Sequence, residues 1–148
     1  MKQKSITALK KLLDKVFSEY IRRRDSGRCF TCGKRDDWKR MQCGHFISRS
    51  NNYLRFSEIN CNCQCLRCNI FLYGNLLEYR RRLIKKFGTG IDERLEKEGR
   101  KIKQFGKAEL EEKISFYRLL LANKNLTYSL GNPNVKETNY YAQAKLKK

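Results

Sequence analysis

Hydrophobic residues near the start of the chain recur at helical spacing. The residues on this stripe are Ile6, Leu9, Leu12, Leu13, Val16, Phe17, Tyr20 and Ile21. Their three- and four-residue intervals predict an amphipathic helix over residues 5–25, with Ser5 as its N-cap. The basic run 22–24 and then Gly27 mark its end. These arginines suit either a solvated helix end or a contact with DNA.

The helical period breaks after Gly27, and a different pattern occupies the next 60 residues. Residues 38–42 and 59–64 are predicted to form two short strands. The polar segment 47–56 forms the loop between them, and a short helix begins at Cys65 and runs to Tyr73. The local order is therefore strand, loop, strand, helix.

Helical spacing returns in the second half of the chain. Asn75 and Glu78 read as a capping box that starts a helix, which ends at Phe87 before Gly88. A short helix over 91–98 and a basic linker over 101–106 follow. A last helix is marked by Leu110, Ile114, Tyr117 and Leu121. Residues 126–148 lack a core pattern and are predicted to be a flexible basic tail.

The composition of this α+β chain indicates the kind of partner that it binds. The chain has 148 residues, which suits one domain, but only 40% are hydrophobic and 33% are charged. Its formal net charge is +19. Such an excess opposes a compact state unless a polyanion offsets it, so nucleic acid is the expected partner. No stretch approaches the ~18 apolar residues that span a bilayer, which argues against a membrane role.

The cysteines indicate the compartment. There are seven, an odd number, and no apolar signal segment lies at the N-terminus. Clustered cysteines in the cytoplasm hold metal more often than they form disulfides. We therefore expect a cytoplasmic, metal-binding protein.

Two Cys-x-x-Cys pairs predict a structural zinc site. The pairs are Cys29 with Cys32, followed by Gly33, and Cys65 with Cys68. Two thiolates from one tight turn can reach a tetrahedral ion at about 2.3 Å. Cys61 and Cys63 would share one face of a strand, so either could compete with the second pair. We prefer the two matched pairs and interpret Cys43, Cys61 and Cys63 as half-buried small side chains.

The single histidine lies between the two cysteine pairs. His45 follows the first predicted strand, and a lone histidine is more often a core or surface residue than a catalyst. A neutral imidazole can nevertheless take a proton from water at pH 7. Arg49 and Arg55 could hold a phosphate as bidentate forks, or equally could tether the local backbone.

The arrangement of Gly44-His45, Asn60 and Cys65-x-x-Cys68-Asn69 resembles the His-Asn-His/Asn (HNH) nuclease motif. The resemblance implies a zinc-stapled ββα-metal core flanked by N- and C-terminal helices. It also implies that His45 is the general base, that Asn60 fixes the loop that orients it, and that Asn69 binds a catalytic Mg²⁺ or Mn²⁺. The second ligand of that ion is unknown, because Gly44 replaces the Asp found there in many members.

A narrower resemblance is to the phage NinG (lambda Rap-like) recombination nucleases. It spans about residues 6–121 and includes Gly44-His45-Phe46-x-Ser48-Arg49, Arg55-Phe56-x-Glu58-x-Asn60 and Gly74-Asn75-Leu76. Asn62 departs from it, since such sequences often have His there. The implied domain covers residues 1–125, with the core at 28–88 and the C-terminal helices at 89–123.

The resulting hypothesis is a metal-dependent, structure-selective endonuclease that hydrolyses branched recombination intermediates of the Holliday junction or D-loop type. Further DNA-binding candidates are Arg81, Arg82, Lys85 and Lys86 on one helix. The alternatives are a non-catalytic zinc-stapled recombination accessory protein and an RNA-binding zinc module. The sequence leaves a homodimer open.

Overall fold

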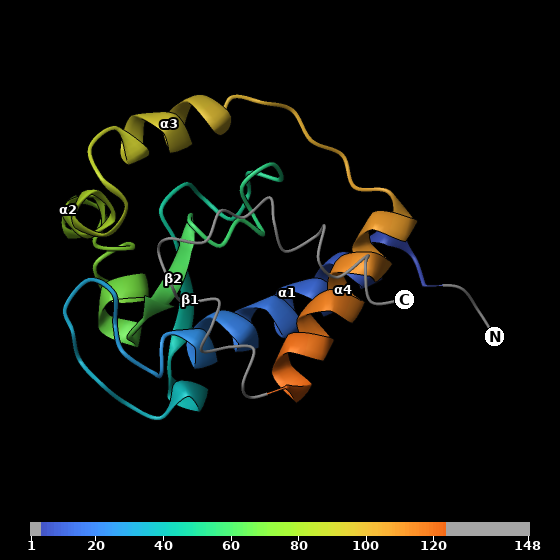
Figure 1. Ribbon diagram of the computed structural model, residues 1–148, viewed down its shortest axis with the longest axis horizontal. Coiled ribbons are helices and arrows are strands. Elements are labelled where there is room, and N and C mark those ends of the chain that lie inside the picture. The colour runs from blue at the N-terminus through green and yellow to red at the C-terminus, as the bar shows by residue number, and fades with distance from the viewer. Residues whose placement is uncertain (1–3, 124–148) are drawn as a thin grey trace.

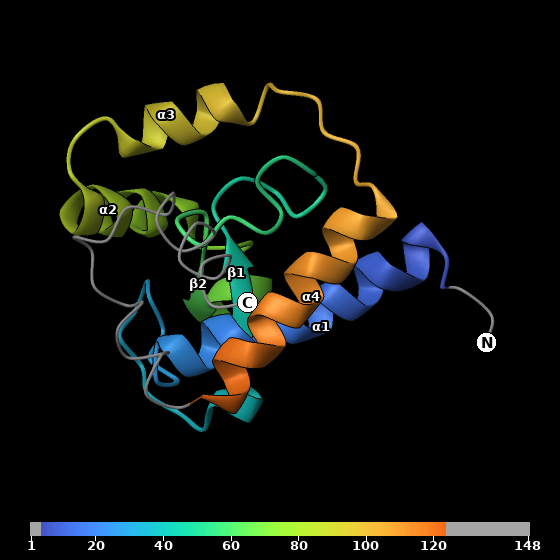
Figure 2. The same ribbon diagram turned by 45° about the vertical axis from the view of Figure 1, so that its right-hand side comes forward.

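The computed structural model describes residues 4–123, and it places a small β-hairpin between two helical layers (Figure 1). In chain order the elements are α1 (Ile6–Arg24), η1 (Trp38–Arg40), β1 (Gln42–His45), β2 (Cys61–Gln64), η2 (Arg67–Phe71), α2 (Leu76–Phe87), α3 (Ile91–Glu98) and α4 (Lys107–Ala122). Helices α1 and α4 lie side by side against one part of the hairpin, with α2 and α3 on the other side, in both views (Figures 1 and 2). The class is α+β, as the sequence predicts.

The α1 stripe forms the first core together with α4. Ser5 caps α1 by accepting a hydrogen bond from the amide of Ala8 at 3.2 Å, as predicted. The rings of Phe17 and Tyr20 each lie 5.0 Å, centroid to centroid, from the ring of Tyr117 on α4. Leu120, rather than the expected Leu121, completes the buried row of α4. Non-local aromatic packing therefore fixes α4 against α1.

The hairpin presents two chemically different faces. Its antiparallel register pairs Gln42 with Gln64, Cys43 with Cys63, Gly44 with Asn62 and His45 with Cys61. Because side chains alternate along a strand, the cysteines and His45 share one face, and the amides share the other with Gly44. Cys61 belongs to the α1–α4 core, whereas Asn62 donates to the hydroxyl of Tyr79 on α2.

Both strands begin later than the sequence pattern predicts. The expected strand over 38–42 is wrong in most of its length, because residues 38–40 form the 3₁₀ turn η1. Asp37 stabilises that turn by accepting a hydrogen bond from the amide of Lys39 at 3.0 Å. Pairing starts only at Gln42 in β1 and at Cys61 in β2. Local turn chemistry here outweighs strand propensity.

The start of α2 also differs from the prediction. Asn75 adopts a left-handed conformation (φ 49°) and makes no side-chain cap, so the capping box is wrong. Glu78 instead pairs with arginines of its own helix. The end of α2 is as predicted, since Gly88 has φ 96° and the chain turns there.

A second core joins α2, α3 and the loop between the strands. Its buried members are Phe46, Leu54, Tyr79, Leu83, Ile91 and Leu95. The segment after β2 is the short π-helical turn η2, which begins two residues after the predicted helix start at Cys65, and the long helix α2 follows from Leu76. None of the helices over residues 4–123 has the length and apolarity needed to cross a membrane. The predicted tail, 126–148, lies outside the described residues.

Candidate metal centre and nucleic-acid site

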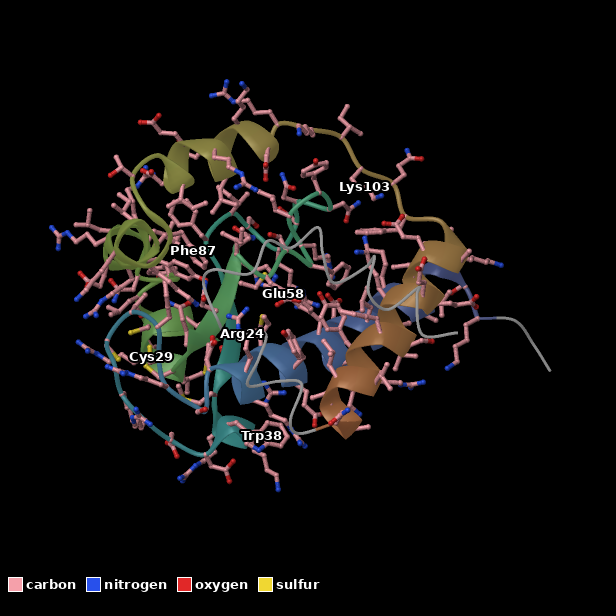
Figure 3. All side chains as sticks on the ribbon, viewed as in Figure 1. Arg24, Cys29, Trp38, Glu58, Phe87 and Lys103 are labelled. Carbon is pink, nitrogen blue, oxygen red and sulfur yellow. The ribbon has the colours of Figure 1, made fainter. Side chains whose placement is uncertain are left out.

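The four cysteines of the two Cys-x-x-Cys pairs come together, as predicted. The Sγ atoms of Cys29, Cys32, Cys65 and Cys68 all lie within 4.8 Å of one another. Figure 3 shows sulfur atoms gathered near Cys29. The Cys32 and Cys65 sulfurs are 3.7 Å apart, close to the ~3.8 Å edge of a tetrahedron with zinc–sulfur bonds of about 2.3 Å. The donor set and its spacing therefore fit a structural zinc ion.

The first cysteine turn is shaped to hold a thiolate. Gly33 has φ 78°, and its amide donates to the carbonyl of Cys29 at 2.9 Å, which closes the turn. Burial alone would raise the pKa of Cys29, but backbone amides of Cys32 and Cys65 and the Thr31 hydroxyl lower this pKa to about 6. Burial and the neighbouring thiols raise the pKa of Cys32, in the same turn, to about 12, so Cys29 is the thiol of this turn that is ready to bind metal at neutral pH.

An outer contact supports the second pair. The side-chain amide of Asn75 donates towards the Sγ atom of Cys68 at 3.6 Å. The left-handed backbone of Asn75 thus positions a hydrogen bond to a candidate metal ligand. Such outer contacts orient ligands and tune the metal. Sequence reasoning assigned Asn75 a capping role and missed this one.

His45 is held by the backbone of the loop between the strands. Its Nε2 atom lies 3.0 Å from the carbonyl oxygen of Arg55. A carbonyl only accepts, so Nε2 carries the proton and Nδ1 is left with a lone pair. Burial, together with the charges of Arg49 and Arg55, lowers the pKa of His45 below 6.5. The imidazole is therefore neutral at pH 7.

Asn60 braces the same loop. Its side chain is fully buried and its Nδ2 atom donates to the carbonyls of Ile47 and Leu54, at 3.0 and 3.1 Å. Its Oδ1 atom accepts from the amide of Ile47 at 2.8 Å. These three bonds fix both ends of the segment that carries the loop past His45. Asn60 therefore holds this loop, and its part in catalysis stays a prediction.

Asn69 lies away from His45. Its Nδ2 atom donates to Oε1 of Gln42 at 2.6 Å. Gln42 and His45 are three residues apart on one strand, so their side chains leave opposite faces of the hairpin. The structure therefore does not bring together the two residues that the resemblance assigned to the base and the ion.

The side-chain groups that could bind a metal near His45 differ from the oxygen donors that Mg²⁺ and Mn²⁺ prefer. Over residues 4–123, the groups of three or more adjacent His, Cys, Asp or Glu ligands all contain thiols. Position 44 could not hold the Asp of other nucleases without displacing a neighbour, because a Cβ on Gly44 would lie 2.0 Å from Oε1 of the buried Gln64. Hard ions prefer carboxylate and carbonyl oxygens, so these donors do not fit them.

A carboxylate that sequence reasoning missed holds two of the predicted phosphate ligands. Asp14 on α1 accepts from Nε and Nη2 of Arg55, at 2.9 and 2.6 Å, and from Nη2 of Arg49 at 2.9 Å. Burial would raise the pKa of Asp14, but the two arginines outweigh it and lower this pKa. Asp14 precedes these arginines by 41 and 35 positions, so no local pattern reveals the pairing.

The predicted basic face of α2 divides into exposed and packed residues. Arg81 and Arg82 pair with Glu78 at 3.4 and 3.0 Å, and Lys85 is exposed. The ammonium of Lys86 lies over the rings of Phe87 and Phe30, and burial lowers its pKa. The Lys86 ammonium therefore contacts aromatic rings as well as adding positive charge to this face.

Arg24, labelled near Glu58 in Figure 3, has a structural role. Its buried guanidinium donates to the carbonyls of Glu58 and Cys61, both at 3.0 Å, and to Oδ1 of Asn62 at 3.1 Å. Asn62 also donates to Tyr79 at 3.1 Å. Asn62 stands where NinG-like sequences often have His. Its side chain is thus part of a buried hydrogen-bond network between α1, β2 and α2.

Comparison with protein families places this geometry in a known group. The family described as Bacteriophage Lambda NinG protein matches residues 1–127. The chain belongs to the NinG family. NinG membership indicates a function related to phage recombination, and it agrees with the resemblance seen in the sequence. No curated protein and no solved structure matches the chain.

Proposed function

We propose that this NinG-family chain is an endonuclease that cleaves branched DNA, with His45 as the general base. The observation that supports this most is the hydrogen bond from Nε2 of His45 to the Arg55 carbonyl, at 3.0 Å. It leaves the neutral imidazole with one unprotonated nitrogen in a loop that Asn60 braces. A base needs both a free lone pair and a fixed direction.

In this proposal, Nδ1 of His45 takes the proton from the water that attacks the phosphodiester. Burial keeps the ring neutral, so the base is ready at pH 7. A positioned general base contributes about 10²–10⁴-fold to such a step. Because the donors beside His45 do not suit Mg²⁺ or Mn²⁺, the dependence of cleavage on these ions has to be measured.

DNA binding in this proposal rests on charge and on the zinc-held frame. The formal charge of +19 favours contacts to phosphates, which carry little sequence information. Exposed cations such as Lys85 and Arg81 on α2 would contact the backbone of the DNA. Zinc on the four cysteines would fix the turn that precedes α2.

The second candidate is a recombination accessory protein that binds branched DNA without cutting it. Two observations favour it. Asn69 contacts Gln42, whose side chain leaves the face of the hairpin opposite His45, and Asp14 pairs with Arg49 and Arg55 beside His45. Both features are expected of a hairpin that serves only to organise a binding surface.

One panel separates the two candidates. Fluorescent four-way, forked and linear DNAs are incubated with the full-length protein in Mg²⁺, in Mn²⁺ and in EDTA, and gel-shift affinities are measured in parallel. We expect tighter binding and cleavage of the branched DNAs. Tight binding with no cleavage of any DNA, in any ion, would establish the accessory role. A contaminating nuclease is excluded by His45→Ala protein purified in the same way.

A further inference from the structure

A second group of metal-ligating side chains surrounds His45. The Sγ atoms of Cys43 and Cys61 and a ring nitrogen of His45 lie within 4.8 Å of one another. Cys61 faces His45 across the hairpin, and Cys43 precedes His45 on the same face of β1. We infer that these three residues form a second metal site, for a soft ion such as Zn²⁺, separate from the four-cysteine centre.

The donor chemistry selects the ion. Two thiols and one imidazole form a Cys₂His set, which binds Zn²⁺ with a fourth position left for water or another ligand. Zinc–sulfur and zinc–nitrogen bonds of about 2.3 and 2.0 Å place tetrahedral ligand atoms ~3.5–3.8 Å apart. A group already within 4.8 Å closes to that spacing by small side-chain movements.

Charge and access also suit such an ion. Two thiolates and Zn²⁺ sum to zero, so the occupied site adds no net charge to a region that contacts the apolar α1–α4 core. Arg24 donates to the Cys61 carbonyl at 3.0 Å, which places its guanidinium charge beside that residue. Cys61 is buried, whereas Cys43 and His45 are half-buried and offer the entry route.

Position on the strand distinguishes this group from its neighbour Cys63. Cys63 lies on the same face, opposite Cys43, yet it packs with the four-cysteine centre and belongs to neither ligand group. The hairpin thus carries three cysteines outside the two Cys-x-x-Cys pairs. Two of them, Cys43 and Cys61, lie close to His45. Cys63 therefore provides a matched control.

Occupancy of this site would act on the proposed reaction. A neutral imidazole has one unprotonated nitrogen, and an ion bound to it leaves no lone pair for the proton of water. If His45 is the base, as proposed above, the bound ion inhibits cleavage and its removal restores it. Metal binding itself does not depend on that proposed function.

The direct test is zinc content. Full-length protein is saturated with Zn²⁺ and separated from unbound ions by gel filtration. Its zinc content is then measured by elemental mass spectrometry. Wild type and Cys63→Ala should retain two zinc ions per chain, and Cys43→Ala should retain one. Co²⁺ loading should give a second thiolate charge-transfer absorption that Cys43→Ala lacks. His45→Ala provides a second variant, also expected to retain one ion, should Cys43→Ala fail to fold by circular dichroism.

One zinc per saturated wild-type chain, or two in both Cys43→Ala and His45→Ala, would overturn the inference. Cleavage tests the consequence separately. Micromolar Zn²⁺ should slow junction cleavage by wild type at least tenfold and leave Cys43→Ala unaffected. Two bound ions in a protein that cuts no DNA would uphold the metal site and reject the proposed nuclease.

Discussion

The Nε2 atom of His45 lies 3.0 Å from the carbonyl oxygen of Arg55, ten residues further along the chain. The side chain of Arg55 in turn holds Asp14 of α1 at 2.6 Å. The only histidine of the protein is therefore oriented by a backbone group that an ion pair anchors to the first helix. This relationship accounts for a neutral, fixed imidazole, and it connects α1 to the proposed chemistry.

The pH dependence of cleavage should reflect the lowered pKa of His45. Burial and the nearby arginines disfavour the imidazolium, so the base stays neutral below the ordinary value of 6.5. The cleavage rate should be flat from pH 8 to below pH 6.5 and then fall as the ring gains a proton. Single-turnover rates across this range test it. A fall that begins above pH 7 would show that another group controls the rate.

Loss of a four-cysteine ligand should destabilise the fold. Cys29→Ser and Cys68→Ser should each release zinc and lower the melting temperature sharply, since the free energy of metal binding contributes to folding. Cys43→Ser should have a mild effect on melting temperature, because Cys43 is half-buried and lies outside that cluster. Metal analysis and thermal unfolding measure both. A folded, active wild type without zinc would refute the structural role.

Asp14→Asn should reveal what the loop arginines do. It removes a charged acceptor shared by Arg49 and Arg55 and should lower the free energy of unfolding by about 1–3 kcal/mol. Because the folded-state pKa of Asp14 lies below 3.8, its stabilising effect is present above that pH and is lost as pH falls. Denaturant unfolding at pH 7 and pH 3 should therefore show the two proteins converging in acid.

The same substitution tests DNA contact by the two arginines. If Arg49 and Arg55 reach phosphates, freeing them from Asp14 should tighten binding of branched DNA. Gel-shift titrations of wild type and Asp14→Asn measure this effect at a temperature where both are folded. Equal affinities would assign the arginines to tethering the backbone.

The exposed cations of α2 should bind DNA without reading its sequence. Replacing Arg81 and Lys85 with Ala should weaken binding of unrelated sequences alike and reduce the slope of log K against log salt by about 2. Lys86→Ala should instead lower stability, because its ammonium lies over the rings of Phe30 and Phe87. A loss restricted to one DNA sequence would contradict a backbone-binding surface.

The sequence predicts what depends on local spacing. The apolar stripe identified α1, and the two Cys-x-x-Cys pairs identified the four residues that cluster in the structure. The end of α2 at Gly88 was also predicted, because a glycine after a helical stretch is a local signal for a helix end. In the structure Gly88 has φ 96°. These features need no knowledge of distant contacts.

Features that depend on pairing between distant segments were missed. The role of Asp14 requires two loop arginines, and the convergence of Cys43 with Cys61 requires the hairpin register. The separation of His45 from Asn69 follows from the hydrogen bond between Asn69 and Gln42, which local sequence patterns do not reveal. The capping box at Asn75 failed because that side chain turns towards Cys68. In each case a tertiary contact outweighs a local preference.

Asn69 can be tested independently of the base. If it binds a catalytic ion, Asn69→Ala should lose cleavage, and raised Mn²⁺ should restore part of it. If Asn69 only holds Gln42 through their 2.6 Å hydrogen bond, the melting temperature of the variant should fall with little change in cleavage rate. Rates over a Mn²⁺ series, together with thermal unfolding, distinguish the two roles.

The most direct test of the nuclease proposal is the single-turnover rate of four-way junction cleavage by His45→Ala, with the protein saturating the DNA. Zinc on the four cysteines and junction affinity should match wild type, while the rate falls by about 10²–10⁴-fold. Cys43→Ala, altered two residues away on the same strand face, should cleave at the wild-type rate in zinc-free buffer. A wild-type rate in His45→Ala would contradict the proposed role of His45.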